Sequence, residues 1–151
     1  MDFMIDSQCL DRVVQLVLPP SDRHVRTARL VAADLASRAG LDCDETDDLR
    51  IAVDEVCHAL IRLGQGPLSF SFVADPVAGV CVTASAEARA AEPASLASQR
   101  AGSAERDDVT GFAAAVLGWV ADTFEMTEHD GRLRFFVSKR HGDAEGAECR
   151  R

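Results

Sequence analysis

The strongest constraint on the fold is one apolar stripe near the middle of the chain. From residue 49, apolar side chains recur at i, i+3, i+4, i+7, i+8, i+11 and i+12, the periodicity of an amphipathic helix: Leu49, Ala52, Val53, Val56, Cys57, Leu60 and Ile61. Thr46 is the predicted N-cap, and Asp47 and Asp48 follow where the helix dipole favours carboxylates. Gly64 is predicted to end the helix. One wide apolar face has to be covered, so this helix must lie against a sheet or another helix.

The residues before this stripe predict a strand and then another helix. Residues 13–18 (VVQLVL) are mostly β-branched or aliphatic and stop at two prolines, which is typical of a strand and its end. Ser21 and Asp22 offer N-cap oxygens for a helix whose apolar residues recur as far as Leu35. Gly40 is predicted to close that helix in the left-handed conformation.

The residues after the stripe predict a hairpin, a third helix and a last strand. Apolar residues alternate with polar or small ones over 68–72 and 80–84, on either side of turn residues, as in an antiparallel hairpin with one buried face. A third helix is predicted over about 109–124. A turn at 129–131 leads into a strand over 133–137.

Two aromatic residues of the third helix allow two interpretations. With Val116 and Val120, Trp119 is predicted to pack on the sheet, and this interpretation is favoured because large aromatic side chains are mostly buried. The alternative is an exposed docking patch formed by Trp119 and Phe112.

Residues from 86 to about 108 are rich in Ala, Ser, Glu and Arg and contain almost no large apolar side chain. We predict a mobile loop there, and a disordered tail over 141–151. Residues 1–140 are then a single domain. The order of elements predicts an α+β fold, a two-layer α/β sandwich whose mostly antiparallel sheet is covered on one face by helices.

Charge and composition narrow the partners and the compartment. The net charge of −9 argues against direct binding of nucleic acid and suits a basic partner. The chain has no run of about 18 apolar residues that could span a membrane, and its acidic start does not resemble a signal peptide, so a cytoplasmic protein is expected. The five cysteines contain no CxxC pair. Cys57 and Cys81 are predicted to be core residues, and a redox role stays open for Cys9 or Cys43.

A resemblance to a known family is strongest between Arg29 and Gly64. The run SRAGLDCDETDDLRIAVDE, which ends at Glu55 and continues as VCHALIRLG, resembles the anti-sigma factor and serine-protein-kinase branch of the GHKL, or histidine kinase-like, ATPases. Its members of the stress-response and sporulation type have a first helix that ends in a glycine turn. Their second helix has an acidic start and carries Glu-x-x-x-Asn. The resemblance extends from about Val14 to Arg140, and it implies the histidine kinase-like ATPase fold and a homodimer.

The nucleotide motifs of that family are altered here. The resemblance places the catalytic base at Glu55, but Ala59 stands where the family has the Asn that holds magnesium, and alanine has no side-chain oxygen. Two glycine motifs of the family's ATP site correspond here to Ala86-Glu87-Ala88-Arg89-Ala90 and Gly111-Phe112-Ala113. We therefore expect no bound cofactor, with ATP and magnesium held only if the site is retained in remodelled form. Glu87 is then the candidate for the adenine-reading carboxylate.

The polar residues of the first two helices also have two interpretations each. Glu55 is either a retained catalytic base or, as we favour, a solvated carboxylate on the polar face of its helix. Asp54 and His58 share that face, and an i,i+4 contact explains them better than a metal pair, so no metal site is predicted. The resemblance places Arg29, with Arg26 one turn before it, where the family contacts the sigma factor and its antagonist. The alternative is a solvated basic strip.

The leading functional hypothesis is an anti-sigma factor that sequesters an alternative sigma factor from RNA polymerase and releases it to an anti-anti-sigma antagonist. One alternative is an active ATP-dependent serine kinase that phosphorylates its antagonist. Another is a pseudo-ATPase binding module with a different signalling client, such as a receiver or phosphotransfer-like protein.

Overall fold

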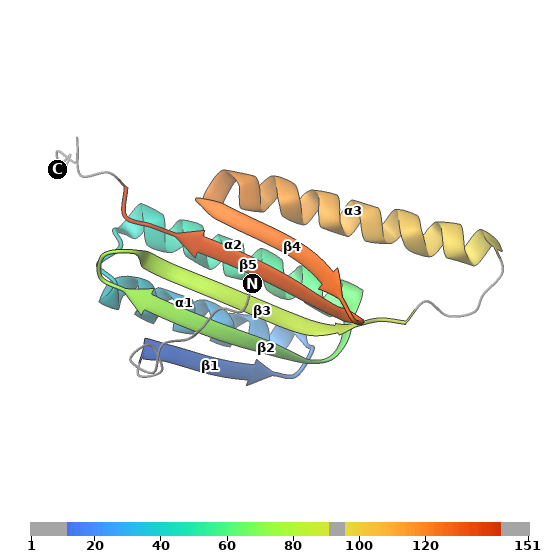
Figure 1. Cartoon of the computed structure of the whole chain (residues 1–151), viewed down its shortest axis with the longest axis horizontal. Helices are drawn as coiled ribbons and strands as arrows, with labels where there is room; N and C mark the ends of the chain where they lie inside the picture. The colour runs from blue at the N-terminus through green and yellow to red at the C-terminus, as the bar shows by residue number, and fades with distance from the viewer. Residues whose placement is uncertain (1–11, 91–95, 143–151) are drawn as a thin grey trace.

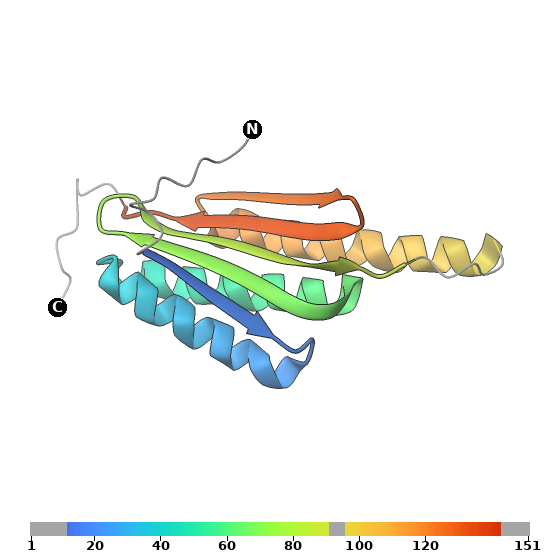
Figure 2. The same cartoon turned by 60° about the horizontal axis from the view of Figure 1, so that its bottom comes forward.

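One antiparallel sheet and a layer of helices make up the molecule, and the computed structural model describes residues 12–90 and 96–142 of it (Figure 1). The strands lie in the order β1-β2-β3-β5-β4, and their bounds are β1 Val13–Leu18, β2 Gly64–Asp75, β3 Gly79–Ala88, β4 Thr123–His129 and β5 Arg132–Lys139. The helices are α1 Val25–Arg38, α2 Cys43–Leu63 and α3 Leu96–Val120, with a 3-10 turn at Asp22–His24 before α1. All three helices cover the same face of the sheet (Figure 2). The predicted α+β sandwich is confirmed.

The core fills the space between the two layers. Every second residue of the central strands points toward the helices, because successive side chains of a strand alternate between its faces. Phe72 and Leu68 of β2 meet Leu49 and Leu60 of α2 in one buried cluster, to which α3 contributes Leu117. The predicted stripe of α2 is buried throughout except at Ile61, which is half-buried.

The N-terminus of α2 differs from the prediction by one turn. Asp42, and not Thr46, is the N-cap, because Asp42 and Glu45 form a capping box that satisfies two free backbone donors. The Glu45 amide donates to Asp42 Oδ1, and the Asp42 amide donates to Glu45 Oε2, both at 2.8 Å. Aspartate followed three residues later by glutamate is the sequence signal for this cap.

Helix α1 ends as predicted but begins differently. Gly40 has φ +77°, and the amides of Gly40 and Leu41 bond back to the carbonyls of Ser37 and Ala36, so the predicted left-handed closure is confirmed. The predicted capping by Ser21 is wrong. No side-chain cap bond forms there, and the chain enters α1 through the 3-10 turn.

The loop predicted from residue 86 is wrong over most of its length. Strand β3 continues to Ala88 and α3 begins at Leu96; residues 91–95 lie outside the described residues. The composition that seemed too polar for a core is also rich in Ala, Arg and Glu, which are strong helix formers. Two ion pairs attach this polar part of α3 to its neighbours, Arg62–Glu105 and Arg106–Glu128.

The sequence does not predict strand β4. The predicted third helix extends to about residue 124, whereas β4 begins at Thr123. The amide of Ala121 still bonds to Leu117, but Phe124 and Met126 belong to β4 and pack against the core as alternate residues. Asp130 and Gly131 both have positive φ, as in the two-residue turns that join hairpin strands. Such a turn needs a strand on each side of it.

Trp119 is not a core residue, which corrects the favoured interpretation. The inward face of α3 is formed by Val109, Ala113 and Leu117, whereas Trp119 lies in solvent and Phe112 borders the space beside α2 with its ring largely exposed. Trp119 is 89% exposed and Phe112 is 64% exposed. The alternative, an exposed aromatic pair, agrees with the structure.

The two cysteines predicted to be core residues, the C-terminal tail and the length of the helices are further features about which the sequence makes predictions. Cys57 is buried as predicted, and burial raises its thiol pKa to about 12, whereas Cys81 is only half-buried. Of the predicted tail, residues 143–151 lie outside the description, and His141 Nε2 donates to the Pro76 carbonyl at 3.0 Å. Within the described ranges, no helix is long and apolar enough to cross a membrane.

Asp42→Ala should lower the free energy of unfolding by about 1 kcal/mol, because the Glu45 amide loses its acceptor at the start of the longest buried stripe. Urea unfolding measures the change. Asp42→Asn is the matched control, since it keeps an oxygen at the cap and should stay within a few tenths of a kcal/mol of the wild type. Equal losses in both variants would contradict the capping role.

Candidate functional site

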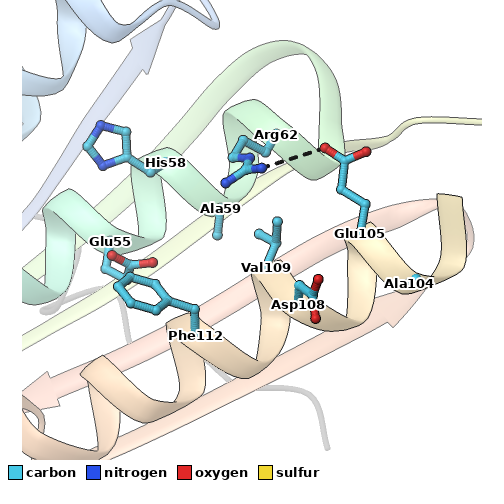
Figure 3. A pocket seen from close by; sticks show the side chains of 9 residues that line it. All are labelled: Glu55, His58, Ala59, Arg62, Ala104, Glu105, Asp108, Val109 and Phe112. Atoms are coloured by element: carbon cyan, nitrogen blue, oxygen red, sulfur yellow. Dashed lines mark ion pairs between the residues drawn. The ribbon is translucent and has the colours of Figure 1, made fainter. Parts of the chain in front are cut away.

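A pocket of about 620 Å³ opens between α2 and α3 (Figure 3). Four of its residues come from α2 and five from α3: Glu55, His58, Ala59, Arg62, Ala104, Glu105, Asp108, Val109 and Phe112. On each helix the lining positions recur at intervals of three and four residues, with adjacent pairs among them, which places them on one side of that helix. The pocket therefore follows directly from the packing of α2 beside α3.

Charged side chains dominate the rim of this pocket. Arg62 of α2 and Glu105 of α3 form an ion pair of 3.6 Å across it. Both side chains are more than half exposed, and such pairs contribute at most about 1 kcal/mol, so this one serves mainly to link the two helices. Asp108 adds a second carboxylate from α3, and no ion pair to it forms within the described residues.

Glu55 is the most perturbed carboxyl of the pocket. Burial raises the pKa of Glu55 above its usual value, His58 partly offsets this shift, and the negative charge of Asp54 adds to it. A half-buried carboxyl with a raised pKa can act as a proton acceptor, so the environment suits a general base. It also departs from the solvated carboxylate that the sequence favoured, because the side chain is half-buried in a pocket.

The predicted nucleotide-binding residues are only partly brought together. Glu55 and Ala59 line the pocket, whereas Ala86, Ala88, Gly111 and Ala113 do not. Glu87 does not take over the adenine-reading role. It is exposed and follows the buried Ala86, so it points to the sheet face opposite the helices.

The lining of the pocket bears on whether magnesium and a nucleotide fit there. Ala59 is buried and presents a methyl group where a magnesium ligand is required. The segment Gly111–Ala113 lies inside the continuous helix α3, so its amides point along the helix. A helix N-terminus, which binds phosphate through free amides, is absent at this point of the described chain.

Apolar side chains also fill the space at the end of strand β3. Ala86 is fully buried, and a Cβ added to the neighbouring Gly64 would come within 3.1 Å of its methyl group. Apolar packing thus occupies the place where the family motif has a carboxylate. The described residues do not fit magnesium and a nucleotide bound in the family's manner.

A second polar site lies on the other side of α2, against α1. Arg29 Nη1 is 3.4 Å from Asp54 Oδ1, and His58 Nδ1 is 3.4 Å from the other oxygen of Asp54. This confirms the predicted i,i+4 contact between Asp54 and His58. Arg29 also lines a shallow depression of about 300 Å³ with Asp47, Arg50, Ile51 and Asp54. Arg26 is exposed one turn earlier on α1.

Three charged residues of the pocket were missed from the sequence. Arg62 could have been found, because it lies seven residues after Glu55 and so on the same side of α2. Glu105 and Asp108 could not, because their segment is predicted as a loop. Within the described part of the chain, no three His, Cys, Asp or Glu side chains are grouped so that they could hold a metal ion.

Glu55→Gln should raise the free energy of unfolding at neutral pH and leave it unchanged in acid. The raised pKa means that ionising Glu55 opposes folding; this cost is absent below the ordinary value of 4.5 and develops as the pH rises through the raised one. The variant's advantage should therefore grow from zero below pH 4.5 to a plateau at neutral pH, as measured by urea unfolding over a pH series.

Glu125→Gln is the matched control, because this exposed residue of β4 loses the same charge without any burial. It should show no comparable gain. A Glu55→Gln protein that is less stable than the wild type at neutral pH would show that the ionised carboxylate supports the fold.

The family of this chain follows from its similarity to known protein families. A search of curated proteins finds no match. Residues 18–135 match the family described as histidine kinase-like ATPase domain. The match runs from the end of β1 to the middle of β5 and includes both helices that form the pocket. With its antiparallel sheet, covering helices and pocket between α2 and α3, this chain belongs to the histidine kinase-like ATPase domain family.

Proposed function

We propose that the protein is an anti-sigma factor, which sequesters an alternative sigma factor from RNA polymerase and releases it to an anti-anti-sigma antagonist. Membership of the histidine kinase-like ATPase family supports the proposal, since the sequence resembles its anti-sigma branch. The poor fit of the pocket to magnesium and nucleotide favours a role in binding over phosphoryl transfer, which depends on metal-assisted positioning of phosphate.

The observation that carries the proposal is the surface around Arg29. Arg29 is partly exposed and is held by Asp54, so its guanidinium has a defined position at low cost in side-chain entropy. Two apolar side chains of the same helix pair are also exposed, Leu30 at 57% and Ile51 at 47%. Arginine beside aliphatic surface is the composition of many protein interfaces.

Release by an antagonist requires only competition. If the sigma factor and the antagonist use overlapping parts of the α1–α2 surface, the tighter or more abundant partner displaces the other by mass action. The resemblance further implies a homodimer, which sedimentation of the purified chain tests directly.

The second candidate is a serine kinase that phosphorylates its antagonist. One observation favours it: Glu55, the position of the family's catalytic base, lies in the pocket and has a raised pKa. The same fold could also bind a different signalling client, such as a receiver or phosphotransfer-like protein. Co-purification with a sigma factor separates the first proposal from this last one.

The double variant Arg26→Ala/Arg29→Ala should bind the sigma factor about 30-fold more weakly, because interface arginines often contribute about 2 kcal/mol. The measurement is calorimetric titration of the chain with each alternative sigma factor of its source, followed by inhibition of transcription by the corresponding holoenzyme.

Arg38→Ala is the matched control, since Arg38 lies at the far end of α1 and forms its ion pair with Asp34, one turn earlier on the same helix. It should keep the wild-type affinity and melting temperature. If no alternative sigma factor binds the wild-type chain, the proposal is wrong.

Magnesium-ATP at 1 mM should not raise the melting temperature or give heat in a titration. A micromolar site would add about 4 kcal/mol of stability under these conditions, so binding of that strength would raise the melting temperature measurably. Clear micromolar binding would instead support the kinase, and phosphorylation of the antagonist by wild-type and Glu55→Ala proteins would then be compared.

A further inference from the structure

An exposed stripe runs along the flank of α3 that borders the pocket and ends just past the helix. Its members are spaced 4, 3, 4 and 3 residues apart and are all exposed: Asp108, Phe112, Ala115, Trp119 and Asp122. We call this set the α3 stripe. Figure 1 shows α2 in the middle of the helix layer, with α1 on one side of it and α3 on the other. The spacing of the four members inside the helix is that of a seam that packs against another helix, and Asp122 follows two residues after the helix ends.

The centre of the α3 stripe is apolar and open. Phe112 and Trp119 expose most of their surface, although rings of this size each contribute a large apolar area to an interface. Ala115 lies between them, and no atom lies within 4 Å of a Cβ added at Gly111. Two rings separated by small residues leave room for the ridge of a second helix.

Both ends of the α3 stripe carry a carboxylate. Asp108 forms no ion pair in the described part of the chain, and Asp122 accepts one bond, from the Arg140 amide at 2.6 Å. Twelve helical positions separate Asp108 from Val120, the last residue of α3, which corresponds to about 18 Å, and Asp122 follows two residues later. An occupant of matching charge carries Lys or Arg at both ends of an apolar segment of about four turns.

The carboxylates at the two ends of the α3 stripe indicate which kind of partner can bind there. In an antiparallel pair of α3 helices, Asp108 of one copy would face Asp122 of the other, and a parallel pair would bring like residues together. Each arrangement places carboxylates against carboxylates, which disfavours a second copy. The net charge of −9 likewise disfavours anionic lipid and nucleic acid.

We propose that the α3 stripe is a docking site for an amphipathic helix of a partner protein, with apolar residues at its centre and basic residues at both ends. Phe112 and Asp108 also line the pocket beside Glu55, so a basic side chain at one end of the partner reaches the carboxylates there. The inference goes beyond the sigma-factor proposal and does not depend on it, because it uses α3 and neither Arg26 nor Arg29.

Trp119 makes this proposal directly testable, since it is the only tryptophan of the chain. The probe is a synthetic amphipathic peptide of four helical turns, with Leu along one face and Lys at both ends, titrated into the full-length protein. The Trp119 emission should shift to shorter wavelength and saturate as the ring leaves water. A peptide with Glu in place of Lys, and a scrambled peptide of the same composition, should give no saturable shift.

Variants distinguish specific docking from general adhesion. Phe112→Ser and Asp108→Lys should each weaken binding of the Lys peptide at least tenfold by calorimetry. Val77→Ser is the matched control, because Val77 is 88% exposed in the turn between β2 and β3, and it should bind as the wild type does. Melting temperatures identify any variant that fails to fold, for which Phe112→Ala replaces Phe112→Ser.

Two results would overturn the proposal. One is unchanged affinity in the folded Phe112 and Asp108 variants. The other is self-association of the protein that buries Trp119 and is abolished by Phe112→Ser, which would make a second copy the occupant.

Discussion

The burial of α2 between the sheet and its two neighbouring helices fixes the positions of the other elements and of both polar sites described above. Leu49, Leu60 and Val53 are almost completely buried, so the rotation of α2 about its axis is fixed by the core. That rotation decides where the polar residues of the helix go. Asp54 turns toward α1 and Arg62 toward α3, and one helix therefore supplies both polar sites of the molecule.

The continuity of α3 has chemical consequences. A helix that begins at Leu96 uses the amides of Gly111 and its neighbours in its own hydrogen bonds, so they are not free to bind phosphate. The polar first turns of α3 instead bring Glu105 and Asp108 to the pocket opposite α2. The pocket thus combines a perturbed carboxyl with residues that do not fit magnesium and nucleotide bound in the family's manner, and this combination is the physical basis for proposing a binding role.

The family resemblance and the structure agree on the architecture and differ in local detail. Capping by Asp42, strand β4 and the extension of α3 all follow from ordinary local chemistry: a capping box, a two-residue turn and a run of strong helix formers. Each signal is present in the sequence, but the apolar stripe and the lack of large apolar residues are stronger patterns there and favour a different prediction.

The α+β fold, the buried stripe of α2, the glycine closure of α1 and the altered nucleotide motifs can all be read from the sequence, because periodicity, turn chemistry and residue type are local properties. The exposure of Trp119 and the direction of Glu87 away from the pocket follow from the packing of the helices on the sheet. The contact of Arg62 with Glu105 was equally beyond the sequence. Which side of α3 is inward depends on how Val109 and Leu117 pack on the sheet, and no local pattern contains that information.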